Sequence, residues 1–527
     1  MTLAIRSEPL GGGALARLAL AGRAPQGWYV APPPDAQGWR THAEHVRARF
    51  PEGGWLPPLA AAFAAGGVAA ERLARCAREG GVVVTTGQQP GLFGGPLYTW
   101  WKALSALAFA DALEAAIGIP VAPVFWAATD DSDFAEASWT QVAVDGGVET
   151  LRLSHPGVEG VPMARLPLGD EITSLAVRLA RGAGSAPFAR ALELARAAYE
   201  PGRTVGDAYL ALTRGLLEPL GVAVLDASHE ATQAAGRPIL LRALEGAPAI
   251  DAALRERVRD IEALGLRPQA PVVEGRSLVF ASTPAGKQRI AVDAATRAAA
   301  AASAGELSPN VLLRPVVERV LLPTVAYMAG PGEIAYFAQV SAVAEALGEA
   351  PPLALPRWSG TVVEPRVRKI LERYDIGLEE LRQPHAVEGR LARGALPRIV
   401  TDALDEGRRA ADRLAVNLTN GDAPRLVPAA AVEGARRGLL HRLDRLERRY
   451  LAAAKRREAA IMADVATARG ALFPNGKRQE RALNLVPLLA RYGPSLVDGV
   501  RERAAEHAVA LLGARGTGRD APLAHAR

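Results

Sequence analysis

The stretch GVVVTTGQQPGLFGGPLYTWWKALSALAFADALEAAIGIPVAPVFWAATDDSD, residues 81–133, decides the fold of this chain. Its β-branched start, Gly81–Thr86, predicts a strand that enters a Gly-rich turn at Gly87–Gly95. A helical segment follows from Pro96 to about Ile117, and Val121–Ala127 predicts a second buried strand. Strand, turn, helix and strand form a βαβ unit. Such a unit requires a parallel sheet with a right-handed crossover and collects ligands at the carboxyl ends of its strands.

The same doubly wound pattern continues along the chain. A strand at Val222–Leu225 ends at Asp226, and another is predicted at Thr324–Ala329. Two short alternating segments, Ser277–Ala281 and Arg289–Val292, are typical of a hairpin. We therefore predict an α/β fold with a Rossmann-like parallel-sheet core. The expected regions are a helical and loop region at 1–80 and the core at 81–362, with insertions at about 140–200 and 250–305.

Long helices are predicted from residue 363 onward, where the strand signals stop. A spacing of four and three, typical of a coiled-coil seam, connects Leu439, Leu443, Leu446, Tyr450, Ala453, Arg457 and Ala460. A similar stripe is formed by Leu404, Ala411, Leu414 and Leu418, and a turn at 420–422 would fold the two helices back antiparallel. This pattern fits a surface helix pair or a dimer-forming arm. The expected regions are a coiled coil at 363–470, a segment returning to the core at 471–510 and a disordered tail at 511–527.

Composition places the chain among ordinary globular proteins of two or three structural units. It has 527 residues, of which 49% are apolar and 22% are charged. The net charge of +6 comes from basic residues scattered among acidic ones, so no nucleic-acid partner is expected. The single cysteine, Cys76, excludes a disulfide framework and fits a reducing compartment. No signal peptide or membrane anchor is indicated, and we expect a cytoplasmic protein without a membrane partner.

The Gly-rich turn is the strongest candidate for ligand binding. Its glycines let the backbone approach a ligand closely, and backbone amides at the positive end of the following helix favour phosphate or carboxylate. A purely structural strand-to-helix turn is the alternative. The candidate binding residues are Thr86, Gly87, Gln88, Gln89, Gly91, Gly94, Gly95, Tyr98 and Thr99, with Lys102 as a catalytic candidate on the helix face of Thr99.

Further candidates follow other predicted strands. Asp130, Asp131 and Asp133 could bind an ammonium group or hydrated magnesium, or could instead form a solvated turn that caps the next helix. Asp226 could accept a hydrogen bond from a ribose or sugar hydroxyl.

A last pair of motifs lies near the fourth strand. In SPNVLLRP, residues 308–315, Arg314 could grip a carboxylate or phosphate, or could be a buried structural residue. In AGPGEIAYF, residues 329–337, Gly330, Gly332 and Glu333 form a compact loop at the start of a helix. Neither a Ser-His-Asp nor an HExxH pattern is present, which argues against nucleophilic hydrolysis and a His-rich zinc site.

Taken together, the blocks TGQQ-GLF-GPLYT-K, PVFW-A-DD-DF, LRP with LLPTVAYMAGPGEIAYFAQ, and LFPNGK-QER resemble the BshC family, the cysteine ligases of bacillithiol biosynthesis. The resemblance covers the chain from about residue 80 to residue 493. It implies a Rossmann-like core related to nucleotidyltransferases and class I synthetases, and an antiparallel coiled coil that supports a homodimer. The implied reaction joins the cysteine carboxyl to the amine of glucosaminyl malate, the last step of bacillithiol synthesis.

The resemblance also carries expectations about chemistry. ATP, alone or with Mg²⁺, is the expected activator of the cysteine carboxylate, and no tightly bound metal is expected. Lys102 and Arg314 would stabilise charge on phosphates, Asp130 or Asp133 would hold the cysteine ammonium or a metal, and Asp226 would position a hydroxyl.

Two departures and two alternatives accompany this resemblance. Ser132 stands where the family has a His in its EDHDF turn, and Gly94, Gly95, Pro96 and Leu97 replace the HIGH signature of the related synthetases. A non-catalytic scaffold of the same pathway is one alternative function. A nucleotidyltransferase acting on another amino sugar is the other.

Overall fold

The computed structural model describes residues 3–154, 159–283, 286–302, 306–420 and 427–513. These residues divide into two compact units. The larger unit contains Leu3–Val142, Thr150–Val362 and the segment from Glu480 onward, and the smaller unit contains Ala143–Glu149 and Val363–Gln479.

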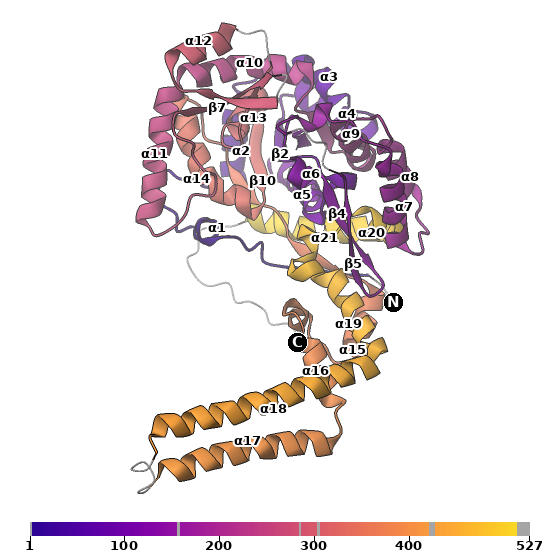
Figure 1. Ribbon diagram of the computed structural model, residues 1–527. Coiled ribbons are helices and arrows are strands. Elements are labelled where there is room, and N and C mark those ends of the chain that lie inside the picture. Colours follow the sequence, from indigo (N-terminus) through magenta and orange to yellow (C-terminus); the bar gives the residue numbers. More distant parts are fainter. Residues whose placement is uncertain (1–2, 155–158, 284–285, 303–305, 421–426, 514–527) are drawn as a thin grey trace. The chain divides into compact units, whose positions relative to one another are not determined.

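A five-stranded parallel sheet forms the centre of the larger unit (Figure 1). Its strands are β2 (Val82–Gln88), β3 (Val121–Ala127), β6 (Ala223–Asp226), β10 (Thr324–Ala329) and β11 (Ala354–Pro356). They lie in the order β11-β10-β2-β3-β6, and every neighbouring pair is parallel. The four predicted strands are confirmed, whereas the short β11 was not predicted. The strand order reverses between β2 and β10, which is where doubly wound sheets open a crevice for ligands.

One face of this sheet is covered by α5 (Leu97–Ile117), which packs against β2, β3 and β10. Of its 21 residues, 15 are buried, as expected for a helix that is apolar all round. α21 (Pro494–Leu512) also packs against α5, so α5 is shielded from water by a second helix as well as by the sheet. Among the described residues, no helix is long and apolar enough to cross a membrane.

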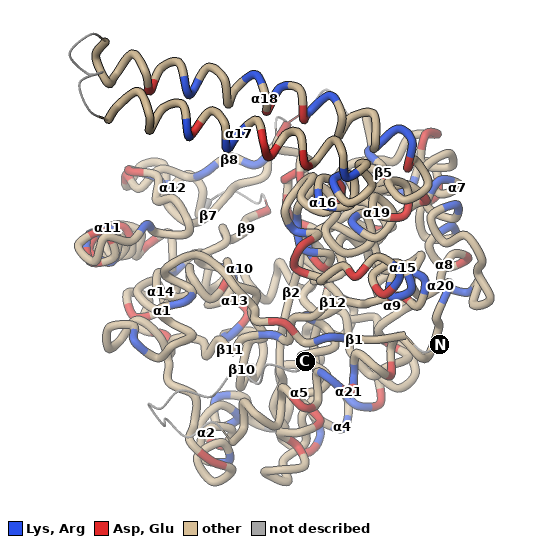
Figure 2. Tube along the Cα trace, turned by 90° about the horizontal axis from the view of Figure 1, so that it is seen from below, with Lys and Arg blue, Asp and Glu red and all other residues tan. Residues whose placement is uncertain are grey.

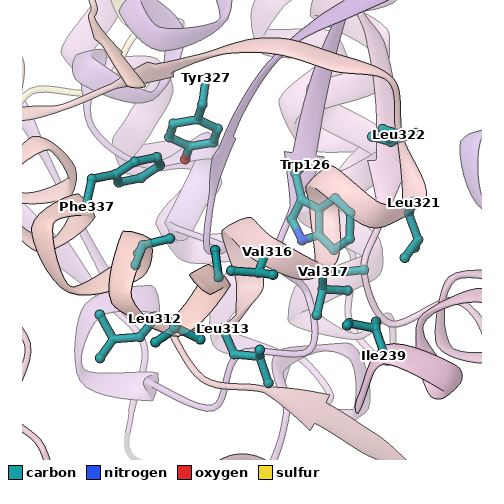
Figure 3. Packing of buried hydrophobic residues seen from close by; sticks show 14 of the residues in the cluster. Trp126, Ile239, Leu312, Leu313, Val316, Val317, Leu321, Leu322, Tyr327 and Phe337 are labelled. Atoms are coloured by element: carbon teal, nitrogen blue, oxygen red, sulfur yellow. The ribbon is translucent and has the colours of Figure 1, made fainter. Parts of the chain in front are cut away.

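The opposite face belongs to a large apolar cluster that joins the sheet to α10 (Glu230–Glu245), α13 (Arg314–Leu321) and α14 (Pro331–Ala346). Figure 3 shows Trp126 of β3 close to Val317 of α13 and Ile239 of α10. Full burial of such a side chain stabilises the folded state by about 1.5–3 kcal/mol relative to leaving it exposed. This packing fixes the elements that surround the carboxyl ends of the strands.

Further elements lie before, between and after these strands in the sequence; most belong to the larger unit, and residues 143–149 and 363 of the smaller unit fall within three of them. The predicted hairpin is confirmed as β7 (Arg276–Thr283) and β8 (Gly286–Ala291), and it is joined by an unpredicted third strand, β9 (Leu307–Pro309). The remaining elements are β1 (Ala4–Ser7), which pairs with β12 (Gly360–Val363), α1 (Ala14–Leu20), α2 (Ala36–Arg47), α3 (Ala60–Phe63), α4 (Gly67–Arg78), α6 (Phe134–Ala137), β4 (Trp139–Val144), β5 (Gly147–Arg152), α7 (Glu171–Ala183), α8 (Arg190–Ala198), α9 (Val205–Leu217), α11 (Ala247–Ala263), α12 (Ala294–Ala302) and α20 (Val486–Tyr492).

The smaller unit is mainly helical. It contains α15 (Pro365–Arg373), α16 (Ala386–Gly394), α17 (Arg398–Thr419), α18 (Ala429–Arg457) and α19 (Ala459–Leu472). The long helices α17 and α18 pack side by side as a hairpin (Figure 1). Lys and Arg are interspersed with Asp and Glu along both of them (Figure 2). The hairpin is the predicted coiled coil, although Gly421, Asp422 and the tail from 514 to 527 lie outside the described residues.

The predicted seam of this hairpin is confirmed at Leu443, which packs against Gly407 of α17, but is wrong at several other positions. Leu439, Leu446 and Tyr450 are 41–44% exposed, whereas Glu447 and Ala454 of the same helix are buried. Glu447 accepts hydrogen bonds from Arg408 of α17 and Arg393 of α16. In a coiled-coil seam this position is usually occupied by an apolar residue such as Leu or Ile. Because Glu447 is charged, apolar spacing pointed to the neighbouring stripe that contains Leu446.

The predicted facing stripe on α17 is confirmed at two of its four positions and wrong at the other two. Leu404, Ala411 and Ala415 are buried, but Leu414 and Leu418 are exposed. Gly407 lies so close to the side chain of Leu443 that an added Cβ would come within 3.2 Å of it. The two helices therefore approach through small residues, a few larger apolar residues such as Leu404 and Leu443, and ion pairs, while several other large apolar residues remain outside.

Cys76 provides a probe of the core. Its thiol lies against the Val82 carbonyl at 3.1 Å, and burial raises its pKa to about 12. We expect a thiol reagent such as Ellman's reagent to label the folded protein roughly 10³-fold more slowly than the urea-unfolded chain, because labelling requires an opening that costs about 4 kcal/mol. Equal rates in the two states would contradict a buried Cys76.

Candidate active site at the carboxyl ends of the parallel strands

A cavity of about 570 Å³ lies at the carboxyl ends of β2 and β3, beside the start of α14. Its charged and polar lining includes Gln88, Gln89, Asp130, Asp131, Ser132, Asp133, Glu159, Gln233, Lys287, Arg289, Ser308, Asn310, Arg314, Glu333 and Tyr336. All of these residues belong to the larger unit. The position next to the reversal of strand order and the concave polar lining are those of a substrate site in a doubly wound sheet.

Lys102 lies beneath this cavity rather than in its wall. It is only 2% exposed, in the middle of the apolar helix α5, and its ammonium group donates hydrogen bonds to three oxygens. The acceptors are the Gly87 carbonyl, Gln88 Oε1 at 3.1 Å and Glu333 Oε1 at 2.8 Å. Because an ammonium group has three protons to donate, this arrangement satisfies the charged form fully. Lys102 thus joins the end of β2 to the first turn of α14.

Glu333 is the carboxylate that connects this buried pair to the cavity. It also accepts hydrogen bonds from the Gly330 backbone N–H at 2.6 Å and from the Tyr327 hydroxyl. Burial alone would raise the pKa of Glu333, but the Lys102 ammonium and these donors lower it below its usual value. Glu333 is therefore an ionised carboxylate at the cavity surface.

Arg314 lines the cavity beside Glu333 and is held from below. Its guanidinium donates to Glu318 Oε2 at 2.7 Å and to the Tyr327 hydroxyl at 3.2 Å, and it lies 5.2 Å from the Tyr327 ring. Glu318 is in turn bound by the Thr85 hydroxyl. Two cations and two carboxylates form a compensated layer under the cavity, so Arg314 is both buried and structural while still facing the site.

The acidic turn after β3 forms another part of the cavity lining. Asp130 forms an ion pair with Lys287 at 3.1 Å, and Asp133 caps α6 by accepting from the Glu136 N–H at 3.0 Å. Asp131 accepts from the Asp133 N–H at 2.7 Å, while burial and its two neighbouring carboxylates raise its pKa. Among the described residues, no three His, Cys, Asp or Glu side chains converge as a metal site.

Gly87 lines the cavity, but the later glycines of the predicted binding turn, Gly91, Gly94 and Gly95, do not. The Gly94 N–H donates to the Tyr199 hydroxyl at 3.2 Å, and the Asn484 side-chain amide donates to the Phe93 carbonyl at 2.9 Å. Gly94 has a φ of +85°, and a Cβ there would come within 2.6 Å of Trp100. This placement does not support the prediction that Gly91, Gly94 and Gly95 hold a phosphate; they make a tight structural turn instead.

Other predicted residues also have structural partners. Thr86 donates to the Met328 carbonyl at 2.8 Å and so ties β2 to β10. Asp226 accepts from Thr129 and from the Ser228 N–H and hydroxyl. Tyr98 donates to Glu136 at 3.2 Å. The lining therefore brings together Gly87, Gln88, Gln89, Asp130, Asp131, Asp133, Arg314 and Glu333, and leaves out Thr86, Gly91, Gly94, Gly95, Tyr98, Thr99, Lys102, Asp226, Gly330 and Gly332.

Sequence reasoning missed four polar residues of the cavity lining. Lys287 and Arg289 of β8 come from the second insertion, whereas Ser308 of β9 and Asn310 belong to the SPNVLLRP motif, in which only Arg314 was a candidate. The signal was present in part, because the hairpin was predicted and its second strand places Lys287 and Arg289 two residues apart, on one face. The packing of that face on a distant strand end could not be read from the hairpin alone.

Replacement of Lys102 tests whether the buried pair supports the fold. Lys102→Met would leave Glu333 buried without its counter-charge, and we expect the free energy of unfolding to fall by about 3–5 kcal/mol. Urea unfolding followed by circular dichroism measures this change. The exposed Lys369→Met on α15 is the matched control, with an expected change below about 0.5 kcal/mol. The double variant Lys102→Met with Glu333→Gln should recover part of the loss; equal stability of all variants would contradict the pair's role.

Comparisons with known proteins agree with this fold. Two family models match the chain: "Bacillithiol biosynthesis BshC, N-terminal Rossmann-like domain" over residues 55–358, and "Bacillithiol biosynthesis BshC, C-terminal coiled-coil domain" over residues 424–509. Curated relatives named "Putative cysteine ligase BshC" include one from Koribacter versatilis, 34% identical, with 80% of this chain and 81% of the relative covered. Those from Solibacter usitatus and Salinibacter ruber are 31% and 33% identical and cover 84% and 80% of this chain, and 86% and 80% of their own lengths. The chain therefore belongs to the BshC family of bacillithiol biosynthesis.

Proposed function

We propose that this protein is a cysteine ligase that joins the carboxyl group of cysteine to the amine of glucosaminyl malate, the last step of bacillithiol synthesis. The observation that carries the proposal is the cavity beside the point where the strand order reverses, lined by Gln88, Arg314 and Glu333. Its relatives carry the name of a cysteine ligase, which supports the same reaction.

Amide formation from a free carboxylate requires a leaving group better than hydroxide, and we propose ATP as its source. The cysteine carboxylate would attack the α-phosphorus of ATP and release pyrophosphate. The neutral amine of glucosaminyl malate would then attack the activated carbonyl carbon, AMP would leave, and the amine proton would pass to a base. One ATP becomes AMP and pyrophosphate for each amide bond formed.

The cavity residues suggest a division of roles. Asp131 is the proposed proton acceptor for the attacking amine, because burial raises its pKa and makes it a stronger base than an ordinary Asp. The ionised Glu333 would hold the ammonium group of cysteine, and Arg314 would face the phosphate oxygens. Lys102 would position Gln88 and Glu333 through its hydrogen bonds without touching the substrates.

The charge balance of the cavity bears on the nucleotide. Five carboxylates (Asp130, Asp131, Asp133, Glu159 and Glu333) and three cations (Lys287, Arg289 and Arg314) line it. A triphosphate would therefore bring its own divalent cation, and Mg²⁺ commonly binds through phosphates with only one or two protein carboxylates. The acidic turn offers such carboxylates, while Ser132 in place of the family His supplies no imidazole there.

The reaction is tested by mass spectrometry of the purified protein with cysteine and glucosaminyl malate, with and without ATP and magnesium. We expect a thiol product only with ATP, accompanied by AMP. Asp131→Asn should lower kcat by roughly 10²-fold or more, whereas the exposed Asp170→Asn should leave it unchanged. Absence of product under every condition, with nucleotide still bound, would contradict the ligase and favour a scaffold.

We also propose that the chain forms a homodimer through the hairpin of α17 and α18. The support is the set of large apolar side chains left outside the hairpin seam, namely Leu414, Leu418, Leu439, Leu446 and Tyr450. Exposed apolar residues gathered on a helix pair favour association with a complementary surface, and a second copy offers the same residues.

The dimer is tested by light scattering after size-exclusion chromatography. Charges placed in the outer stripe, as in Leu439→Glu with Leu446→Glu, should convert a dimer of about twice 55.3 kDa to a monomer with unchanged helical content. The exposed Arg445→Glu on the same helix is the control and should remain dimeric. A monomeric wild-type protein, or a dimer that survives both charges, would overturn this assembly.

A further inference from the structure

One wall of the cavity is a face of the three-stranded sheet β8-β7-β9. Phe280 in β7 pairs with Arg289 of β8 on one side and with Ser308 of β9 on the other. Residues directly opposite each other in neighbouring strands lie on the same face, as does Lys287, two residues from Arg289. All four residues line the cavity. The sheet therefore presents two cations, an aromatic ring and a hydroxyl to the cavity.

The aromatic ring holds both cations in place. Lys287 Nζ lies 5.8 Å and Arg289 Cζ 5.2 Å from the centre of the Phe280 ring. Contacts of this kind are attractive and restrict the long side chains to one region of the wall. The hairpin itself is anchored, because the Lys287 N–H donates to the Gly160 carbonyl at 2.9 Å and a Cβ on Gly286 would come within 2.8 Å of that residue. The cations are therefore positioned before any ligand arrives.

The two cations differ in their partners. Lys287 is neutralised by Asp130, at 3.1 Å. Arg289, by contrast, has no carboxylate within ion-pair distance among the residues that the structure describes, although it is half-buried. Burial without a counter-charge lowers its pKa. A half-buried guanidinium facing a cavity without a partner gains two parallel charged hydrogen bonds when a carboxylate binds.

Two further donors line the same cavity on the other side of Phe280. The Ser308 hydroxyl is buried and has no hydrogen-bond partner within the described part of the chain. Asn310 accepts hydrogen bonds at Oδ1 from the Leu312 and Leu313 N–H groups at 3.1 and 3.0 Å, so the donor end of its side chain is the end left for a ligand. A wall that offers a guanidinium, a hydroxyl and an amide N–H group suits an oxyanion with several acceptor atoms.

We propose that Arg289, with Ser308 and Asn310, binds a carboxylate of the amine-bearing substrate. The inference rests on the proposed ligase function and assigns this wall to glucosaminyl malate, whose malate part carries carboxylates. Arg289 is the single uncompensated cation that we find in the described lining, which matches one carboxylate better than a polyphosphate. The ion pair between Lys287 and Asp130 places this wall beside the turn that follows β3. The strand order reverses on the other side of β2, between β2 and β10.

Binding to Arg289→Gln and Arg289→Lys tests this assignment, with the exposed Arg259→Gln on α11 as control. Isothermal titration with L-malate and with glucosaminyl malate should show a Kd raised roughly 10- to 100-fold in Arg289→Gln, partly restored in Arg289→Lys and unchanged in the control. The Kd for ATP should stay within about threefold of wild type. In turnover, KM for glucosaminyl malate should rise while kcat stays within about threefold.

The outcomes separate this inference from the ligase proposal. Malate binding that depends on Arg289 in a protein without ligase activity would support the carboxylate site at Arg289 and contradict the proposed ligase function. Ligation by Arg289→Gln with an unchanged KM for glucosaminyl malate would support the ligase function and overturn the proposed carboxylate site at Arg289. A loss of ATP affinity in place of malate affinity would assign the wall to phosphate and overturn the inference. If Arg289→Gln lowers the melting temperature, Ser308→Ala provides the second test, with an expected three- to tenfold rise in the Kd for malate.

Discussion

The ion pair between Lys102 and Glu333 holds together the part of the fold in which the candidate site lies. Lys102 comes from the helix after β2, and Glu333 comes from the helix after β10, so the pair bridges the two strands between which the strand order reverses. Burying two charges is unfavourable unless both are paired and hydrogen-bonded. Here the ammonium has three acceptors and the carboxylate has three donors. The crevice at this point is therefore kept open by a satisfied polar layer and not by apolar packing alone.

The cavity above this layer is assembled from parts with different tasks. The parallel strands and α14 supply a floor in which Arg314 and Glu333 are fixed by Tyr327 and Glu318. The acidic turn after β3 and the antiparallel sheet of the second insertion supply the walls, joined by the pair of Asp130 and Lys287. This division explains why charged residues far apart in sequence face one small volume. It also separates groups that are already neutralised from those, such as Arg289, whose charge is left for a ligand.

The smaller unit shows the same use of polar groups within packed elements. Glu447 lies inside the helical hairpin and is bound by Arg393 and Arg408, while some leucines, such as Leu439 and Leu446, remain outside. A polar group in a helical seam commonly fixes the register of the helices at some expense of stability. The outward apolar residues are then free to serve association, which is the basis for the proposed homodimer.

The Rossmann-like sheet could be predicted from the amino-acid sequence alone, because the buried strands at 82–88 and 121–127 are short runs of apolar and β-branched residues joined by one long apolar helix. The sequence also predicted that Gln88, the acidic turn and Glu333 lie close together, since parallel strands bring their carboxyl ends to one edge, and all of them line one cavity with Arg314. Only the tertiary structure decided that Lys102 lies beneath the cavity and that Gly94 is turned away from it, because both depend on contacts with residues more than 100 positions away. The same holds for Arg289, whose place in the wall follows from the docking of a hairpin onto a distant segment, and for the seam at Glu447, where ion pairs override the apolar pattern.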